Sequence, residues 1–200
     1  MSARKKPTPQ LIALAAIGAL AAAAIGFWLA GTTGLDGWRH ATRFTARFSF
    51  VWFLAVWSAS ALARLWPGGW RSALLYNRRG VGLGFATAHL IHAFFFSVEN
   101  LGFGHVSSIT TLAGGGLGYV FVLLMAITSN DYWVKRLGGG WKLLHTIGVN
   151  YIAFIFAFTY LGAFMKGVTA PVPSIALGLL GAAFLMRMAA FAVARRPRPA

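Results

Sequence analysis

Six long apolar runs constrain the fold of this 200-residue chain more than any other feature. They cover residues 11–30, 48–63, 80–98, 112–129, 141–165 and 173–194. A run of about 18 or more apolar residues is typical of a membrane-spanning helix, and Arg47 and Arg64 extend the shorter second run because their side chains reach the interface. Because strands leave backbone groups unpaired in lipid, the sequence predicts an all-α integral membrane bundle of six transmembrane helices.

The composition supports this class and excludes others. Hydrophobic residues make up 58% of the chain and charged residues only 10%, whereas a soluble domain carries about 25% charged residues. The net charge of +15 could indicate nucleic acid, but the charges cluster between the apolar runs, so we expect membrane lipid and no nucleic acid as partner. The absence of cysteine excludes disulfides, iron–sulfur clusters and covalently attached haem. Residues 1–200 are expected to form a single transmembrane domain.

The distribution of basic residues predicts the orientation. If the six runs cross the membrane in turn, fourteen of the eighteen Lys and Arg residues fall on the side that holds both termini. The four on the other side are Arg39, Arg43, Arg47 and Lys166. By the positive-inside rule, both termini are expected in the cytoplasm. The first apolar run could be a cleaved signal peptide, but its 20 residues exceed the usual ~7–15, so a retained helix is expected. Residues 31–46 and 99–111 are predicted to be outer loops, and residues 130–140 an inner loop.

Two histidines stand inside apolar runs, each just after a basic turn. His92 follows Arg78-Arg79, and His145 follows Gly138-Gly-Gly-Trp-Lys142. An intramembrane ionisable residue indicates a functional site by default, and two imidazoles on different helices could bind one haem iron between them. Such ligation leaves the iron no open position, which suits electron transfer. His92 lies about 18 Å along its run and His145 only about four residues into its own, so their depths differ unless a helix tilts or starts earlier.

Other residues are candidates around this centre. His89, one turn before His92, could be a substitute ligand, a hydrogen-bond partner or a packing residue. A haem propionate could meet Arg78, Arg79, Lys142 or a backbone N–H, because cationic and carboxylate groups form strong charge-assisted hydrogen bonds, and Arg79 is the named candidate. Loop positions are expected for His40, as a solvated residue, and for His105, as a solvated or quinone-contacting residue.

Acidic residues are too few for several catalytic schemes. The chain has only three, all expected in loops: Asp36, Glu99 and Asp131. Serine–histidine–acid catalysis, paired-carboxylate catalysis and proton transport through an intramembrane acid are therefore not expected, and no residue is assigned a catalytic role. Whether the chain is itself an enzyme stays open. Most tryptophans stand near the ends of the runs, which indicates an interfacial aromatic belt.

The ordered motifs resemble a known family. They are Arg78-Arg79-x-x-Gly82-Leu83 before His92, Leu137-Gly-x-x-Trp141-x-x-Leu144-His145, and Arg43-Phe-Thr-Ala-Arg47. Over roughly residues 36–165 they resemble the ferric-reductase-like transmembrane domain, and within it the haem-binding membrane subunits of bacterial periplasmic methionine sulfoxide reductase systems.

The resemblance implies a multi-pass b-type cytochrome of the bacterial inner membrane, with His92 and His145 as haem ligands. It implies electron supply by a separate flavin reductase or by quinol, so that FMN or quinone would act through a partner, and delivery to a periplasmic reductase. The family often carries a further histidine where this chain has Phe158, so one haem b is expected and a second is in doubt. The competing hypothesis is a non-redox multi-pass protein whose histidines serve packing or transport.

Overall fold

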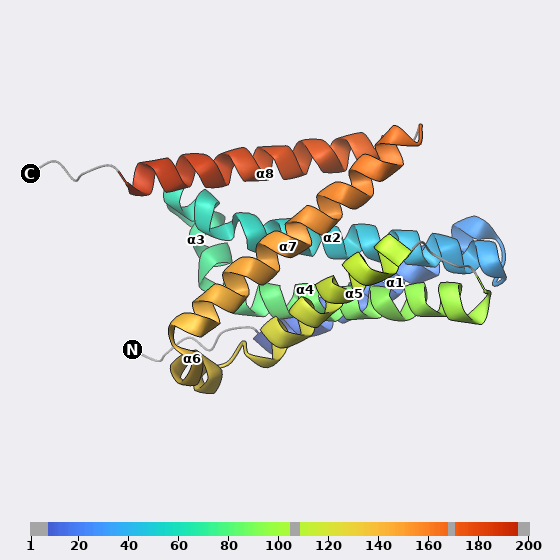
Figure 1. Cartoon of the computed structure of the whole chain (residues 1–200), viewed down its shortest axis with the longest axis horizontal. Helices are drawn as coiled ribbons and strands as arrows, with labels where there is room; N and C mark the ends of the chain where they lie inside the picture. The colour runs from blue at the N-terminus through green and yellow to red at the C-terminus, as the bar shows by residue number, and fades with distance from the viewer. Residues whose placement is uncertain (1–7, 105–108, 168–170, 196–200) are drawn as a thin grey trace, which may run out of the picture.

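The structure, a computed structural model, describes residues 8–104, 109–167 and 171–195, apart from the side chains of residues 110 and 111. These residues form helices and short connections without any β-strand (Figure 1). The predicted all-α class is therefore confirmed. His105 and the basic residues 4–6 lie outside the described residues.

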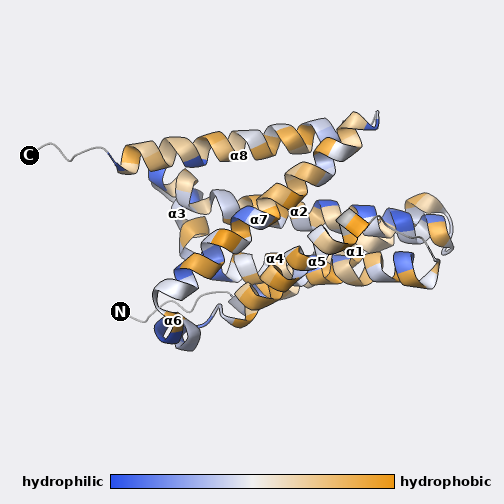
Figure 2. Ribbon diagram, in the orientation of Figure 1, coloured by the Kyte–Doolittle hydropathy of each residue, from blue (hydrophilic) through white to orange (hydrophobic). Residues whose placement is uncertain are grey.

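Among the described residues, five helices are long and apolar enough to cross a membrane. They are α1 (Thr8–Ala30), α2 (Leu35–Leu65), α4 (Arg78–Ser97) with the π-helical turn η1 (Val98–Gly102), α7 (Gly139–Met165) and α8 (Val172–Ala194). The helix α5 (Ile109–Ile127) would make a sixth span together with α6 (Asp131–Leu137), although the two are bent by 105°. Apolar residues colour much of the length of these helices in Figure 2. The chain is thus compatible with a membrane bundle of five or six spans.

The helices α1, α2 and α4 form the most closely packed part of the bundle. Ala15, Ala19 and Ala23 recur every four residues along α1 and are buried against the neighbouring helices. Small side chains allow helix backbones to approach closely in lipid. At Gly26 the backbone of α1 lies directly against that of α2, because a Cβ there would lie 2.6 Å from the backbone nitrogen of Ala41. We call α1, α2 and α4 the tight unit.

The helices α7 and α8 attach to α2 through larger side chains. The ring of Phe156 on α7 lies 5.1 Å from the rings of both Phe50 and Phe53 on α2, and Leu180 of α8 joins the same core. The helix α5 packs on α7, whereas α4 and α7 do not pack closely on each other. In Figure 1, α7 runs obliquely between α8 and α5. We call α5, α7 and α8 the open unit.

Basic residues gather at one end of the bundle. The start of α1 and the end of α8 lie at the same end of the bundle as α6 and the short α3 (Gly69–Tyr76) (Figure 1). The connection from α1 to α2, the end of α7 and the start of α8 lie at the opposite end. This arrangement fits an even number of crossings. We call the end that carries α3 and α6 the basic end. Basic residues lie there in α3, in α6 and in the first turns of α4 and α7: Arg71, Arg78, Arg79, Lys135, Arg136 and Lys142.

The predicted outer loop at residues 31–46 is wrong, because α2 begins at Leu35. This segment is an amphipathic helix whose buried face carries Ala41, Thr45 and Ser49. Its arginines recur every four residues and share another face, at Arg39, Arg43 and Arg47. The charges interrupted the apolar run and so concealed the helical period.

Two other predicted loops contain helical turns. Within residues 130–140, α6 begins after Asn130, whose side chain accepts a hydrogen bond from the Trp133 backbone N–H at 3.0 Å. This is an ordinary N-cap. The segment 99–111 begins as the π-helical turn η1, and α5 starts within it at Ile109.

Candidate functional site

Two histidines of α4 face two hydroxyl groups of α2. His89 and His92 are three residues apart, and Ser49 and Thr45 are four apart, so each pair lies on one face of its helix. The Ser49 hydroxyl is 3.1 Å from His89 Nδ1, and the Thr45 hydroxyl is 3.3 Å from His92 Nδ1. The tight packing of α2 on α4 therefore fixes one nitrogen of each ring.

The hydroxyl protons settle which nitrogen of each ring carries hydrogen. The Ser49 hydroxyl donates to the Ala46 carbonyl at 2.9 Å, and the Thr45 hydroxyl donates to the Ala41 carbonyl at 2.9 Å. A hydroxyl has a single proton, so toward the histidines each oxygen accepts. We therefore assign the hydrogen of each neutral ring to Nδ1, which leaves a lone pair on Nε2 of both His89 and His92.

Aromatic side chains surround the α4 histidines. The His89 ring stacks on Phe85 at 5.2 Å between centroids and lies 5.0 Å from Tyr119 of α5 and 5.6 Å from Phe156 of α7. The His92 ring lies 5.4 Å from that of His89. His89 thus faces the open unit, one turn closer to the basic end than His92.

His145 is held in the same protonation pattern by other means. Its Nδ1 lies 3.0 Å from the Trp141 carbonyl, which can only accept, so this nitrogen carries the hydrogen. The Trp141 ring stacks on His145 at 4.0 Å, and its Nε1 donates to the Thr128 carbonyl at 2.8 Å. The Nε2 of His145 lies 3.4 Å from the hydroxyl of Ser129, which donates to the Met125 carbonyl. The Trp141 carbonyl and the Ser129 oxygen are both acceptors in this arrangement, and a neutral His145 has one ring hydrogen for the two of them. The shorter contact assigns that hydrogen to Nδ1, so the lone pair of Nε2 faces Ser129.

A cavity of about 450 Å³ separates α4 from α7, and we call it the basic cavity. One of its walls is apolar, with Leu83, Val122 and Val149 among its residues. The polar lining comprises His145, Ser129, Thr146 and four cationic side chains: Arg78, Arg79, Lys142 and Arg187. Gly82 and Ala86 of α4 line it as well and leave space beside that helix. The cavity therefore suits a ligand that is both apolar and anionic.

The structure separates the predicted site residues. His145 and Arg79 line the basic cavity, whereas His92 does not, and no contact joins His92 to His145 among the described residues. His89 lies behind Phe85, which lines the cavity. Arg79 is engaged by Asp131 of α6 in an ion pair.

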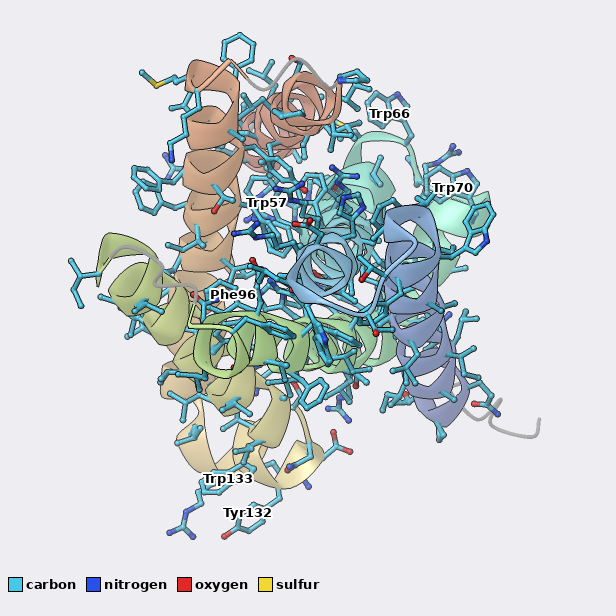
Figure 3. All side chains as sticks on the ribbon, turned by 90° about the vertical axis from the view of Figure 1, so that its right-hand side faces the viewer. Trp57, Trp66, Trp70, Phe96, Tyr132 and Trp133 are labelled. Atoms are coloured by element: carbon cyan, nitrogen blue, oxygen red, sulfur yellow. The ribbon has the colours of Figure 1, made fainter. Side chains whose placement is uncertain are left out.

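Several functional neighbours escaped the sequence analysis. Ser49 and Thr45 lay in or beside a predicted loop, and only their helical spacing relative to the histidines would have indicated a contact. Arg187 lines the basic cavity from α8, which an isolated charge inside an apolar run could have signalled. Trp57 lies inside the bundle, whereas Trp66, Trp70, Tyr132 and Trp133 project outward as expected of an aromatic belt (Figure 3).

The remaining candidates lie away from the basic cavity. His40 is a half-buried residue of α2, so its predicted loop position is wrong. Phe158 is exposed on α7 and stacks with Phe154, so this position faces away from the core. The predicted contact of His105 with solvent or quinone lies outside the described residues.

The ligand set fits a haem better than a bare metal ion. No group of three or more His, Cys, Asp or Glu side chains able to hold a metal ion occurs among the described residues. A haem iron already has four porphyrin nitrogens and needs only one or two imidazoles from the protein. Neutral imidazoles, an apolar wall and cationic side chains are the groups that a haem would require of the protein.

No protein-family model matches the chain, and no solved structure matches it. The resemblance of residues 78–92 and 137–145 to the ferric-reductase-like transmembrane domain therefore stays a prediction that rests on those residues, and the geometry of the basic cavity and its histidines is the basis for assigning a function.

Proposed function

We propose that the chain is a membrane b-type cytochrome that passes electrons through a haem bound between α4 and α7. A haem in this place supplies a reversible one-electron change between ferric and ferrous iron. The observation that carries the proposal is that His145, with Nδ1 held by the Trp141 carbonyl, lines a cavity with an apolar wall and four cationic side chains. The motif resemblance supports the same assignment.

His145 and His92 are the proposed ligands, with His89 as the substitute on α4. All three keep Nδ1–H bonded to an oxygen, an arrangement that fixes the tautomer and orients the ring for metal binding through Nε2. The Phe85 contact of His89 favours this ring as the nearer of the α4 pair to the basic cavity. Arg79 is a proposed propionate contact that Asp131 holds in place.

The proposed setting is the bacterial inner membrane, with six spans and both termini in the cytoplasm. The excess of basic residues at one end of the bundle supports this orientation. The electron donor would then be a separate flavin reductase or quinol and the acceptor a periplasmic reductase. A bis-histidine haem leaves no coordination position for a substrate, so the chain would act as the electron-transfer subunit of such a system.

An absorption spectrum tests the proposal. The chain is purified after expression with ample haem supply, and the reduced form is expected to show the sharp α and β bands of a bis-histidine haem. Substitution of an iron ligand removes them, so His145→Ala is expected to lose most of the bound haem. His40→Ala, on α2 and away from the cavity, is the matched control and keeps full occupancy.

The α4 ligand is decided by a second pair of variants. His92→Ala and His89→Ala are compared for haem content, and the variant that loses the bands identifies the ligand. The alternative function, a non-redox protein with packing histidines, predicts a colourless wild type under the same supply. A colourless preparation, or full haem occupancy in all three histidine variants, overturns the cytochrome assignment.

A further inference from the structure

Arg187 is held inside the bundle by a single residue of α2. Its Nη1 donates to the Trp57 carbonyl at 2.7 Å, and its guanidinium lies 5.0 Å from the centroid of the Trp57 ring. Figure 3 shows Trp57 in the interior of the bundle. Arg187 stands seven residues before the end of α8, about 10 Å along the helix from that end, and it lines the basic cavity. The Arg187 guanidinium is thus held about two helical turns inside the end of α8.

Three further cations line this cavity with Arg187, and one of them, Arg79, is paired with Asp131. Arg78 comes from α4 and Lys142 from α7, and Arg78 lies within electrostatic range of both Arg187 and His145. The described lining contains no acidic residue. Three helices therefore bring positive charges together at one place.

No acidic side chain among the described residues pairs with the other three cations. Of its three acidic residues, Asp131 pairs with Arg79, and Asp36 and Glu99 lie within ion-pair distance of Arg39 on α2. Arg78, Lys142 and Arg187 have no ion pair among the described residues. Like charges repel strongly where the dielectric constant is low, and a cation inside a membrane is costly without a counter-charge. An anion bound between them removes both costs.

We propose that Arg78, Lys142 and Arg187 form an anion site for the acidic head of an amphipathic ligand whose apolar body lies against Leu83, Val122 and Val149. Two ligands share this chemistry: an anionic phospholipid, through its phosphates, and a haem, through its propionates. Basic pockets between transmembrane helices bind the headgroups of multiply charged lipids. The propionate version rests on the proposed function, and the phospholipid version does not.

The test compares two arginines in matched surroundings. Arg71 of α3 lies at the same end of the bundle, donates to the Trp66 carbonyl and lies 5.6 Å from the Trp70 ring, but it does not line the basic cavity. Arg187→Gln and Arg71→Gln therefore remove the same kind of group inside and outside the site. Arg187→Lys keeps the charge and shows whether a loss in Arg187→Gln reflects charge or misfolding.

The first arm uses the haem-free chain in phosphatidylcholine vesicles with and without cardiolipin. Cardiolipin is expected to raise the unfolding temperature of the wild type, Arg71→Gln and Arg187→Lys by about 5 °C, because a ligand that binds only the folded state stabilises it. Arg187→Gln is expected to lose more than half of that rise. This result identifies phosphate as the bound head.

The second arm measures haem content after expression with ample haem. A loss of haem in Arg187→Gln, with full content in Arg71→Gln, identifies propionate as the bound head. Equal behaviour of the two variants in both arms overturns the anion site. A wild type without haem refutes the proposed function alone, because the cardiolipin arm still decides the anion site.

Discussion

The tight unit and the open unit hold their histidines in different ways. In the tight unit, small residues bring α2 against α4, and the hydroxyls of Ser49 and Thr45 meet His89 and His92 directly. In the open unit, aromatic rings hold the helices apart, and His145 takes its hydrogen-bond partner from its own helix, at the Trp141 carbonyl. The first unit depends on contact between helices, and the second leaves space beside its histidine.

The difference in packing suits the tight unit to orienting side chains and the open unit to leaving space for a ligand. Close packing leaves no volume for a ligand but orients side chains rigidly, whereas a cavity offers volume at the cost of lost packing. The α4 histidines lie on the boundary, since their Nδ1 atoms face α2 and the His89 ring faces α5 and α7. A haem between the units would be bound by histidines that the tight unit orients, and it would occupy the cavity beside the open unit.

The largest expected effect tests the close packing of the tight unit. In Gly26→Ala the new Cβ would lie 2.6 Å from the backbone nitrogen of Ala41, so α1 and α2 must move apart. Overpacking of this kind costs about 1–3 kcal/mol or more, and the gain in helix propensity returns only about 1 kcal/mol. We expect a net loss of about 2 kcal/mol in the free energy of unfolding, measured by denaturant titration in mixed micelles.

The control for this prediction lies in the open unit. Gly115 of α5 has no atom within 4 Å of the position that a Cβ would take. Gly115→Ala is therefore expected to stabilise the chain by up to about 1 kcal/mol through helix propensity alone. The two alanine substitutions should have opposite signs, and equal signs would remove the distinction between the units.

The next effect concerns the hydroxyl contacts. Ser49→Ala leaves the Nδ1–H of His89 without its partner, and an unsatisfied polar group inside a bundle costs about 1–2 kcal/mol. Ser129→Ala removes the hydroxyl that donates to the Met125 carbonyl, but His145 itself loses only a 3.4 Å contact and keeps the Trp141 carbonyl. We expect a loss below about 0.5 kcal/mol there. Comparable losses in the two variants would show that the tight unit does not depend on its hydroxyls.

The sequence predicted the helical class well, because uncharged apolar runs are a local signal. The ends of α7 and α8 were predicted almost to the residue for this reason, at residues 165 and 194. The start of α2 was missed because Arg39, Arg43 and Arg47 lower the hydropathy of the segment. Their spacing of four residues is nevertheless that of one face of a helix. Short helices such as α6 depend on a cap, here Asn130, and hydropathy does not report caps.

The sequence identified several residues of the candidate site but not which of them lie together in the structure. His145 and Arg79 were identified as polar groups beside apolar runs, and the structure places both at the basic cavity. The meeting of Arg187 with Arg78 depends on how α8 packs against α2, which no local pattern encodes. Likewise, the separation of His92 from His145 follows from the poor packing of α4 on α7, a property of the whole bundle.

The smallest expected effect concerns the ion pair that joins α4 of the tight unit to the short helix α6 at the basic end. Arg79 of α4 and Asp131 of α6 form an ion pair, but their side chains are 37% and 80% exposed. Exposed pairs contribute about 0.5 kcal/mol or less, so a double-mutant cycle with Arg79→Gln and Asp131→Asn should give a coupling energy in that range. A coupling above about 1.5 kcal/mol would place the pair in a low-dielectric setting. The contact between α4 and α6 would then stabilise the bundle as a buried ion pair does, which the exposure of both side chains argues against.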